Sequence, residues 1–206
     1  MTAGRVVLWR HARTAHNAQG IWQGQLDVAL DDVGRVEAKA AAAALMATEF
    51  PDGAPAAIVS SDLSRATETA AALAELSGLP VTTDPRLREI HAGRWQGMTR
   101  PQIVAAGMGD DLAAWQRGED VRLGGGERRS EVGRRGAEAV RERAAALEGG
   151  TLVVVAHGGL LRGTILTLLG LDPSRWQLLG RLGNCEWARL EPDEPDWRLL
   201  AYALPG

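Results

Sequence analysis

The sequence predicts an α/β fold, a three-layer α/β/α sandwich on a mostly parallel central sheet. Short apolar runs typical of buried strands alternate with longer stretches typical of helices. The run TLVVVA at 151–156 is the clearest strand, because β-branched residues without alternation are typical of a strand covered on both faces. A length of 206 residues fits one domain, so we expect a single domain over 1–206, with 105–127 as an insertion over the functional site.

The remaining elements are predicted from the same patterns. Further strands are expected at 6–9, 56–60 and 81–83, and near 187–191 and 198–203. Residues 32–49 predict a helix with Val33, Val36, Ala40 and Ala44 on its inner face. Ser61 and Asp62 are good candidates to cap the helix that follows the second strand. Two more helices are expected, one beginning near Thr99 and one over 128–147.

Composition excludes several classes of protein. With 45% hydrophobic and 24% charged residues, the chain is typical of a soluble globular protein, and no apolar run approaches the roughly 18 residues of a membrane span. The apolar run at 6–9 is too short for a signal peptide, so we expect a cytoplasmic protein. The only cysteine, Cys185, cannot form an intramolecular disulfide, and a net charge of -3 argues against nonspecific nucleic-acid binding.

Basic residues follow two of the predicted strands. Arg10 and His11 end the first strand and His157 ends the strand at 151–156, so both groups belong at the sheet edge where ligands of α/β proteins bind. Arg65, in the first turn of a helix, is expected at the same edge. Guanidinium groups match phosphate oxygens, and the Gly158–Gly159 turn offers backbone N–H donors. These residues predict a phosphate-binding pocket.

The spacing of these residues resembles that of a known family. Arg10-His11-Ala12-Arg13-Thr14-Ala15-His16-Asn17 is similar to the Arg-His-Gly-x-Thr-x-x-Asn signature of the histidine phosphatase, or phosphoglycerate mutase-like, superfamily. Later blocks follow in the family's order: Gln23-Gly24-x-x-Asp27, Ser61-Asp62-Leu63-x-Arg65-Ala66, Leu87-Arg88-Glu89-Ile90, Gly125-Gly126-Glu127 and Val155-Ala156-His157-Gly158. Several motifs in the right contexts are far more specific than one, and the resemblance extends from residue 5 to about residue 190.

This resemblance implies a catalytic role for each matched residue. His11 would be the nucleophile that forms a phosphohistidine, and Glu89 would be the acid and base that serves the leaving oxygen and then the attacking water. Arg10, Arg65 and His157 would hold the phosphoryl oxygens, with His157 expected to be cationic. Asn17, Gln23, Gly24 and Gly158 complete the expected substrate and phosphate contacts. No metal and no cofactor are implied.

Several residues near this pocket are left without an assigned role. Ala12 stands where glycine is commoner, so its φ should not be positive. His16 and His91 flank the pocket, and Arg100 and Arg117 are the basic candidates in the insertion region. Of seven tryptophans, Trp22, Trp95 and Trp115 are the candidates for pocket walls.

The expected substrate is a small phosphomonoester. A phosphatase is favoured over a mutase, because the insertion has few basic residues to grip a second anion and Gly159 replaces the asparagine of typical mutases. Blocks such as Gly183-Asn184-Cys185-Glu186-Trp187 resemble actinobacterial glucosyl-3-phosphoglycerate phosphatases, which suggests a sugar-acid phosphate or a sugar phosphate. The alternatives are a phosphoglycerate mutase-type phosphotransferase, a noncatalytic phosphate-binding scaffold and a metalloenzyme, although the four histidines form no metal-binding pair. A homodimer is the base-rate expectation for an oligomer.

Overall fold

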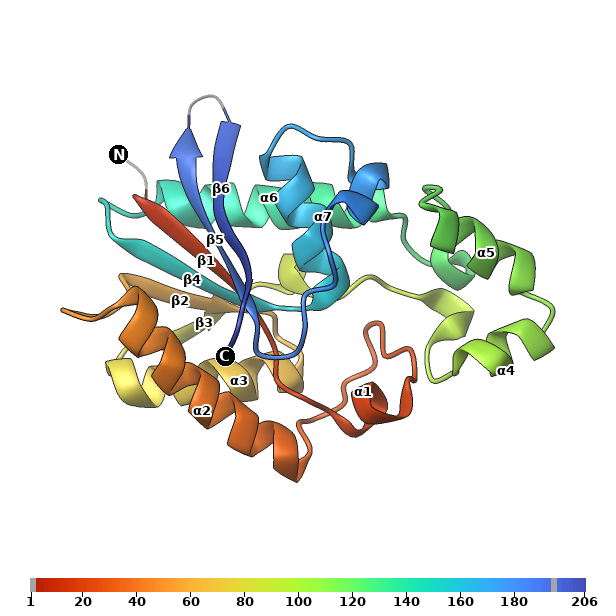
Figure 1. Ribbon diagram of the computed structural model, residues 1–206, viewed down its shortest axis with the longest axis horizontal. Helices are drawn as coiled ribbons and strands as arrows, with labels where there is room; N and C mark the ends of the chain where they lie inside the picture. Colours follow the sequence, from red (N-terminus) through yellow and green to blue (C-terminus); the bar gives the residue numbers. More distant parts are fainter. Residues whose placement is uncertain (1–2, 194–195) are drawn as a thin grey trace.

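A six-stranded mixed sheet forms the centre of the molecule (Figure 1). The computed structural model describes residues 3–193 and 196–206, and the strand order is β3-β2-β4-β1-β5-β6. The strands are β1 (Arg5–Arg10), β2 (Ala57–Ser60), β3 (Val81–Thr83), β4 (Thr151–Ala156), β5 (Trp187–Asp193) and β6 (Asp196–Leu204). β1 to β4 run parallel to one another, and β5 and β6 add an antiparallel edge beside β1. The predicted fold class is confirmed.

Helices cover both faces of this sheet (Figure 1). They are α1 (Ala15–Gln19), α2 (Asp32–Glu49), α3 (Ser64–Ser77), α4 (Arg100–Ala105), α5 (Gly109–Arg117), α6 (Arg129–Ala145) and α7 (Gly158–Leu168). Short 3-10 turns η1 (Pro85–Leu87), η2 (Gly93–Trp95), η3 (Leu123–Gly125) and η4 (Pro173–Leu178) connect them. Nowhere in the described part of the chain is a helix long and apolar enough to cross a membrane.

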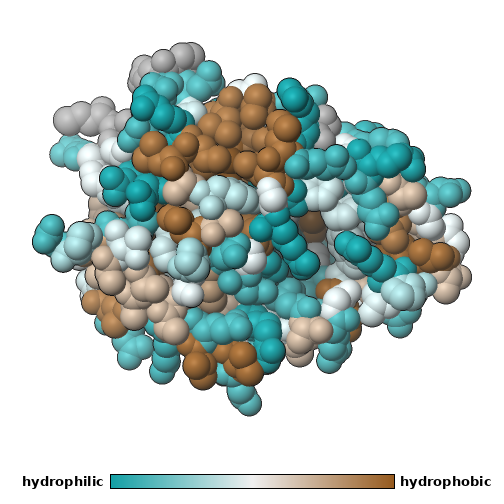
Figure 2. Space-filling model, viewed as in Figure 1, coloured by the Kyte–Doolittle hydropathy of each residue, from teal (hydrophilic) through white to brown (hydrophobic). Residues whose placement is uncertain are grey.

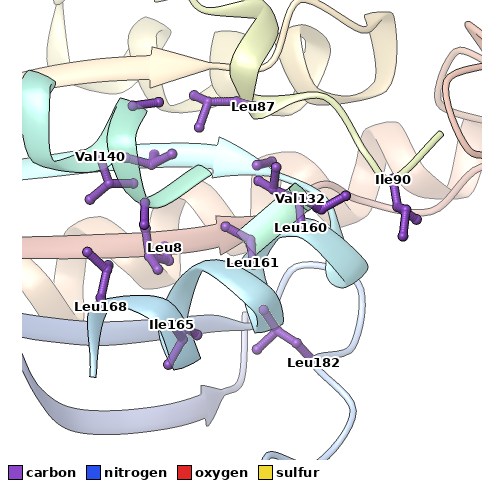
Figure 3. Close-up of a cluster of buried hydrophobic side chains, with 14 of the residues drawn as sticks. Leu8, Leu87, Ile90, Val132, Val140, Leu160, Leu161, Ile165, Leu168 and Leu182 are labelled. Atoms are coloured by element: carbon purple, nitrogen blue, oxygen red, sulfur yellow. The ribbon is translucent and has the colours of Figure 1, made fainter. Parts of the chain in front are cut away.

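Alternation along β1 divides the core into two clusters. Val7 and Trp9 pack with α2 and α3 on one face of the sheet, whereas Val6 and Leu8 pack with α6 and α7 on the other face (Figure 3). Each such fully buried aliphatic side chain contributes about 1.5 to 3 kcal/mol by leaving water. Because both faces of β1 and β4 are buried, their carboxyl ends have fixed positions.

The inner face of α2 differs from the predicted one. Val33 and Val36 are 47% and 69% exposed, whereas Gly34, Ala38, Ala41 and Leu45 face the core. The reason is a close approach at Gly34, where a Cβ would lie 1.9 Å from the carbonyl oxygen of Arg13. Only glycine permits this contact between α2 and the loop that follows His11.

The predicted cap of α3 is also wrong. The helix begins at Ser64, and its N-cap residue Leu63 provides no side-chain hydrogen bond. Asp62 instead forms an ion pair with Arg88 at 2.6 Å, and Ser61 contacts His157. Neither polar side chain therefore caps α3: Asp62 holds Arg88, and Ser61 is a partner of the buried His157.

The stretch 105–127, which we expected to be an insertion, contains regular structure in α5 and η3. α4 and α5 project to one side of the sheet, on the right in Figure 1. Trp115 and Gln116 of α5 line the cavity described below, so this stretch does lie over the predicted site.

Replacing Gly34 with alanine tests the close contact of α2. In an unobstructed helix this change stabilises by about 1 kcal/mol. Here the clash with the Arg13 carbonyl should reverse the sign and lower the free energy of unfolding by about 2 kcal/mol or more. Gly53→Ala, in the loop between α2 and β2, is the control for an added Cβ that meets no atom within 4 Å. Urea unfolding that shows Gly34→Ala to be as stable as wild type would contradict this packing.

Candidate active site

The parallel pairing of β1 and β4 brings the two predicted histidines together. Arg10 pairs in register with Ala156, and the N–H of His11 donates to the carbonyl of Ala156 at 2.9 Å. The His11 and His157 ring centroids are 5.1 Å apart. Both side chains are buried, and His11 lines a cavity of about 1100 Å³. Figure 2 shows the mouth of this hollow to the right of the centre, between hydrophilic side chains.

His11 is held in the form that a nucleophile requires. Its Nδ1 lies 2.7 Å from the carbonyl oxygen of Ala12, and because a carbonyl can only accept, Nδ1 carries the proton. Nε2 therefore keeps its lone pair. Burial, followed by the charges of Arg10 and Arg65, holds the pKa of His11 well below its usual 6.5. The imidazole is neutral at physiological pH.

Arg65 is the most deeply buried charge of the site, with no exposed surface. Its guanidinium donates to the carbonyls of Leu26 and Gly24, each at 2.8 Å, and to Nδ1 of His157 at 3.2 Å. Burial lowers its pKa to about 10, so it remains a cation at neutral pH. The carbonyl of Gly24 therefore positions the guanidinium of Arg65 by accepting a hydrogen bond from it.

The expectation that His157 is cationic is wrong in this structure. Its Nδ1 accepts from Arg65, so the ring proton must be on Nε2, which donates to Oγ of Ser61 at 2.8 Å. Burial, and then the charges of Arg65, His11 and Arg10, hold its pKa well below 6.5. His157 is therefore a neutral ring held between Arg65 and Ser61, behind the residues that line the cavity.

Arg10 and Asn17 also line the cavity, as predicted. Arg10 donates from Nη1 to the carbonyl of Leu182 at 2.7 Å, whereas its Nε is buried without a partner in the described part of the chain. Oδ1 of Asn17 accepts from the N–H of Thr14 and from Asn184, which leaves the amide NH2 of Asn17 for a ligand. Burial lowers the pKa of Arg10, and Glu89 opposes this shift.

Glu89 is oriented by the amino end of α7. Its Oε2 accepts from the N–H of Gly159 at 3.0 Å, and its Oε1 accepts from the N–H of Leu160 at 2.8 Å and of Ile90 at 2.9 Å. The N–H groups expected to bind an anion thus bind this carboxylate. The N–H of Gly158 donates to no acceptor among the described residues, and Gly158 lines the cavity.

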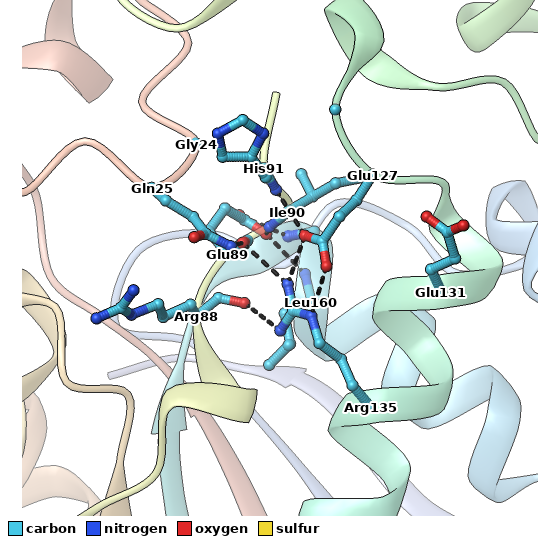
Figure 4. A network of polar contacts seen from close by, with 12 residues as sticks. Gly24, Gln25, Arg88, Glu89, Ile90, His91, Glu127, Glu131, Arg135 and Leu160 are labelled. Atoms are coloured by element: carbon cyan, nitrogen blue, oxygen red, sulfur yellow. Dashed lines mark hydrogen bonds and ion pairs between the residues drawn. The ribbon is translucent and has the colours of Figure 1, made fainter. Parts of the chain in front are cut away.

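The backbone around Glu89 is held by Arg135, a residue that motif reading did not single out (Figure 4). Arg135 donates to the carbonyls of Arg88 and Glu89, at 2.6 and 3.0 Å, and pairs with Glu127 at 2.8 Å. Glu127 in turn accepts from the N–H of His91. The sequence contains a signal for this pair, because Glu127 belongs to the Gly125-Gly126-Glu127 block and Arg135 follows eight residues later in a predicted helix.

The residues near the pocket that had no assigned role fall into two groups, those that line the cavity and those that do not. His16, Arg100, Trp22 and Trp115 line the cavity, whereas His91, Arg117 and Trp95 do not, and Trp95 is fully buried in the core. Trp176, which was not expected to be a pocket wall, does line the cavity. Ala12 has no positive φ, as predicted. No three His, Cys, Asp or Glu side chains within 3–193 and 196–206 gather as a metal-binding group.

Comparison with known proteins agrees with this geometry. Residues 6–205 match the sequence model of the histidine phosphatase superfamily (branch 1). This chain belongs to that superfamily. The resemblance predicted from the motifs is confirmed.

Two groups of relatives are similar to this histidine phosphatase. Glucosyl-3-phosphoglycerate phosphatase from Mycolicibacterium vanbaalenii is 44% identical over 199 residues, covering 92% of this chain and 85% of the relative. A probable phosphoglycerate mutase from Yersinia enterocolitica is 34% identical over 205 residues, covering 97% and 90%. The solved structure of a mycobacterial glucosyl-3-phosphoglycerate phosphatase in complex with VO3 superposes with a TM-score of 0.89 at 40% identity, covering 98% and 99%.

Gly159→Ala tests the fit between α7 and the catalytic carboxylate. A Cβ on residue 159 would lie 2.7 Å from Oε1 of Glu89, so the carboxylate must move. A misplacement of about 1 Å costs up to roughly a hundredfold in rate, and we expect kcat to fall by about tenfold or more. Alanine is favoured over glycine in helices, so the free energy of unfolding should not fall. A variant with unchanged kcat would contradict the placement of Glu89.

The two buried histidines predict a pH dependence of stability. Their pKa values are lower in the folded protein than in the unfolded chain, so below pH 6.5 the unfolded chain binds more protons and stability falls. Between pH 7.5 and 5.5 each histidine should remove about 1 kcal/mol from the free energy of unfolding. Urea unfolding of His157→Gln at both pH values should show a loss smaller by about this amount. An identical loss in wild type and variant would contradict a neutral, buried His157.

Proposed function

We propose that this protein is a phosphatase that hydrolyses a small phosphomonoester through a phosphohistidine at His11. The observation that carries the proposal is the neutral His11, with Nδ1 bound to the Ala12 carbonyl and Nε2 free, in a cavity lined by Arg10 and Arg65. A single Cys185, buried and with a pKa raised to about 12 by burial, suits a reducing compartment such as the cytoplasm.

In the first step Nε2 of His11 attacks phosphorus and the bond to the alcohol oxygen breaks. Arg10 and Arg65 stabilise the charge on the phosphoryl oxygens, and they need no reorganisation because protein carbonyls already hold them in place. His157 accepts from Arg65 through Nδ1 and donates to Ser61 through Nε2, so it helps to fix the guanidinium of Arg65 beside the phosphoryl group. Glu89 provides the proton for the departing alcohol oxygen.

In the second step water attacks the phosphohistidine, and the phosphorus–nitrogen bond breaks. Glu89, now a carboxylate, takes the proton from this water, and inorganic phosphate leaves. Glu89 thereby regains the proton that it gave to the alcohol oxygen in the first step. One carboxyl group therefore serves both steps.

The substrate class that we propose is a phosphorylated sugar acid such as glucosyl-3-phosphoglycerate. This substrate is in the name of the mycobacterial relatives that share 40 to 44% of their residues with this chain. A cavity of about 1100 Å³ is slightly larger than most small-molecule sites and far larger than a phosphate needs. Gly159 stands where typical mutases have asparagine, which favours hydrolysis over transfer.

The decisive experiment combines phosphate release with trapping of the intermediate. We expect wild type to release phosphate from glucosyl-3-phosphoglycerate or 3-phosphoglycerate and to yield an acid-labile, base-stable phosphoenzyme. His11→Ala should lose both, with a rate lower by about a thousandfold or more. Arg134→Gln, on the exposed side of α6, is the control and should behave as wild type.

Two results would overturn this proposal. Label that persists in His11→Ala would place the intermediate elsewhere. Isomerisation of phosphoglycerate faster than phosphate release would make the enzyme a mutase instead.

A further inference from the structure

The cavity extends well beyond the reaction centre, toward a cluster of two arginines and two tryptophans. Arg129 of α6 and Arg162 of α7 lie there with Trp115 of α5 and Trp176 of η4, and all four line the cavity. We call these four residues the distal cluster. None of them belongs to the motifs that identify the family.

The charge lining the cavity is strongly unbalanced. Within the described part of the chain, the only acidic lining residue is Glu89, whereas the basic ones include Arg10, Arg65, Arg100, Arg129, Arg162 and Arg181. Arg10 and Arg65 face the phosphoryl group, which leaves the positive charge of the distal cluster without a role in catalysis. An anionic group on the substrate would balance it.

The two distal arginines differ from the surface arginines in their partners. Arg88 and Arg122 each form an ion pair at 2.6 Å. Arg129 and Arg162 form no ion pair with a carboxylate anywhere in residues 3–193 and 196–206. Their guanidinium groups donate to backbone carbonyls instead: Arg129 to Trp115 at 2.8 Å and Glu119 at 3.1 Å, and Arg162 to Trp176 at 2.6 Å and to Leu179.

Burial makes this arrangement costly without a ligand. Arg129 is only 7% exposed, and burial together with the charge of Arg162 lowers its pKa to about 9, partly offset by Asp120. Burial lowers the pKa of Arg162 as well. Both remain cations at neutral pH. Nε of Arg129 and Nη1 of Arg162 donate to no acceptor among the described residues.

The tryptophans hold the guanidinium groups in place. Cζ of Arg129 lies 4.4 Å from the ring centroid of Trp115 and 4.1 Å from that of Trp176, and Cζ of Arg162 lies 4.0 Å from the Trp176 ring. The ring of Trp176 is therefore covered by guanidinium groups and is not a free platform for a sugar. Stacking fixes the direction of the remaining N–H groups, as binding of a small planar anion requires.

We propose that the distal cluster binds the carboxylate of the substrate's leaving group, with Arg129 and Arg162 as the specificity-determining residues. This inference rests on the proposed phosphatase function and deepens it. His11, Arg129 and Arg162 line the same cavity, so one substrate would place its phosphoryl group at His11 and its acid group at the distal cluster. A phosphomonoester that lacks the carboxylate leaves these two charges without a counter-ion.

The test compares two substrates that differ in this group. 3-Phosphoglycerate carries the carboxylate and glycerol 3-phosphate does not. We expect wild type to favour 3-phosphoglycerate by about tenfold or more in kcat/KM, since hydrogen bonds between two charged groups are stronger than those between neutral ones. Arg162→Gln should abolish most of this preference by raising KM for 3-phosphoglycerate, with glycerol 3-phosphate unchanged within about twofold. Arg129→Gln should act in the same direction.

Controls separate specificity from structure. Arg134→Gln should keep the wild-type ratio, because Arg134 is exposed on α6. If Arg162→Gln does not fold, Arg162→Lys retains the charge without the fork and should lower the ratio by about threefold. Equal losses with both substrates, or no preference in wild type, would overturn the distal carboxylate site. If wild type released phosphate from neither of the two substrates, the proposed function itself would be overturned.

Discussion

The site depends on the parallel register of β1 against β4. Pairing of Arg10 with Ala156 places His11 and His157 side by side at one edge of the sheet, with 5.1 Å between their rings. A slip of one residue would turn His11 to the opposite face of the sheet. The register is fixed because both faces of both strands are buried, so hydrophobic packing far from the cavity sets the geometry of catalysis.

Protein carbonyls make a set of buried arginines tolerable. Arg65 and Arg10 have little or no exposed surface, and their N–H groups donate to Gly24, Leu26 and Leu182 rather than to carboxylates. A carboxylate partner would neutralise the charge that the phosphoryl group needs, whereas a carbonyl positions the guanidinium and leaves it positive. Backbone carbonyls hold Arg129 and Arg162 in the same way, so these arginines also keep their positive charge available for an anion.

The carboxylate of Glu89 is positioned by backbone N–H groups, whereas the buried arginines are positioned by backbone carbonyls. It is fixed by backbone N–H donors at the amino end of α7, while Arg135 holds the carbonyl side of the same residue. Glycine at position 159 permits this contact. The acid and base group is thereby positioned by helix geometry, which links the rate of the reaction to the packing of α7 against the sheet.

Much of this protein was determined by the sequence alone. Continuous apolar strands and motif spacing predicted the α/β sheet, the family, and the arrival of Arg10, His11, Arg65 and His157 at one edge, because strand ends and helix starts are local properties. Only the tertiary structure decided the inner face of α2, the use of Ser61 and Asp62, the neutral state of His157, and the tryptophans and arginines of the distal cluster. Each of these depends on a contact between segments distant in sequence: the Arg13 carbonyl against Gly34, Arg65 against His157, and Arg129 against Trp176. Local patterns carry no information about such distances, and burial and charge at a site are set by them.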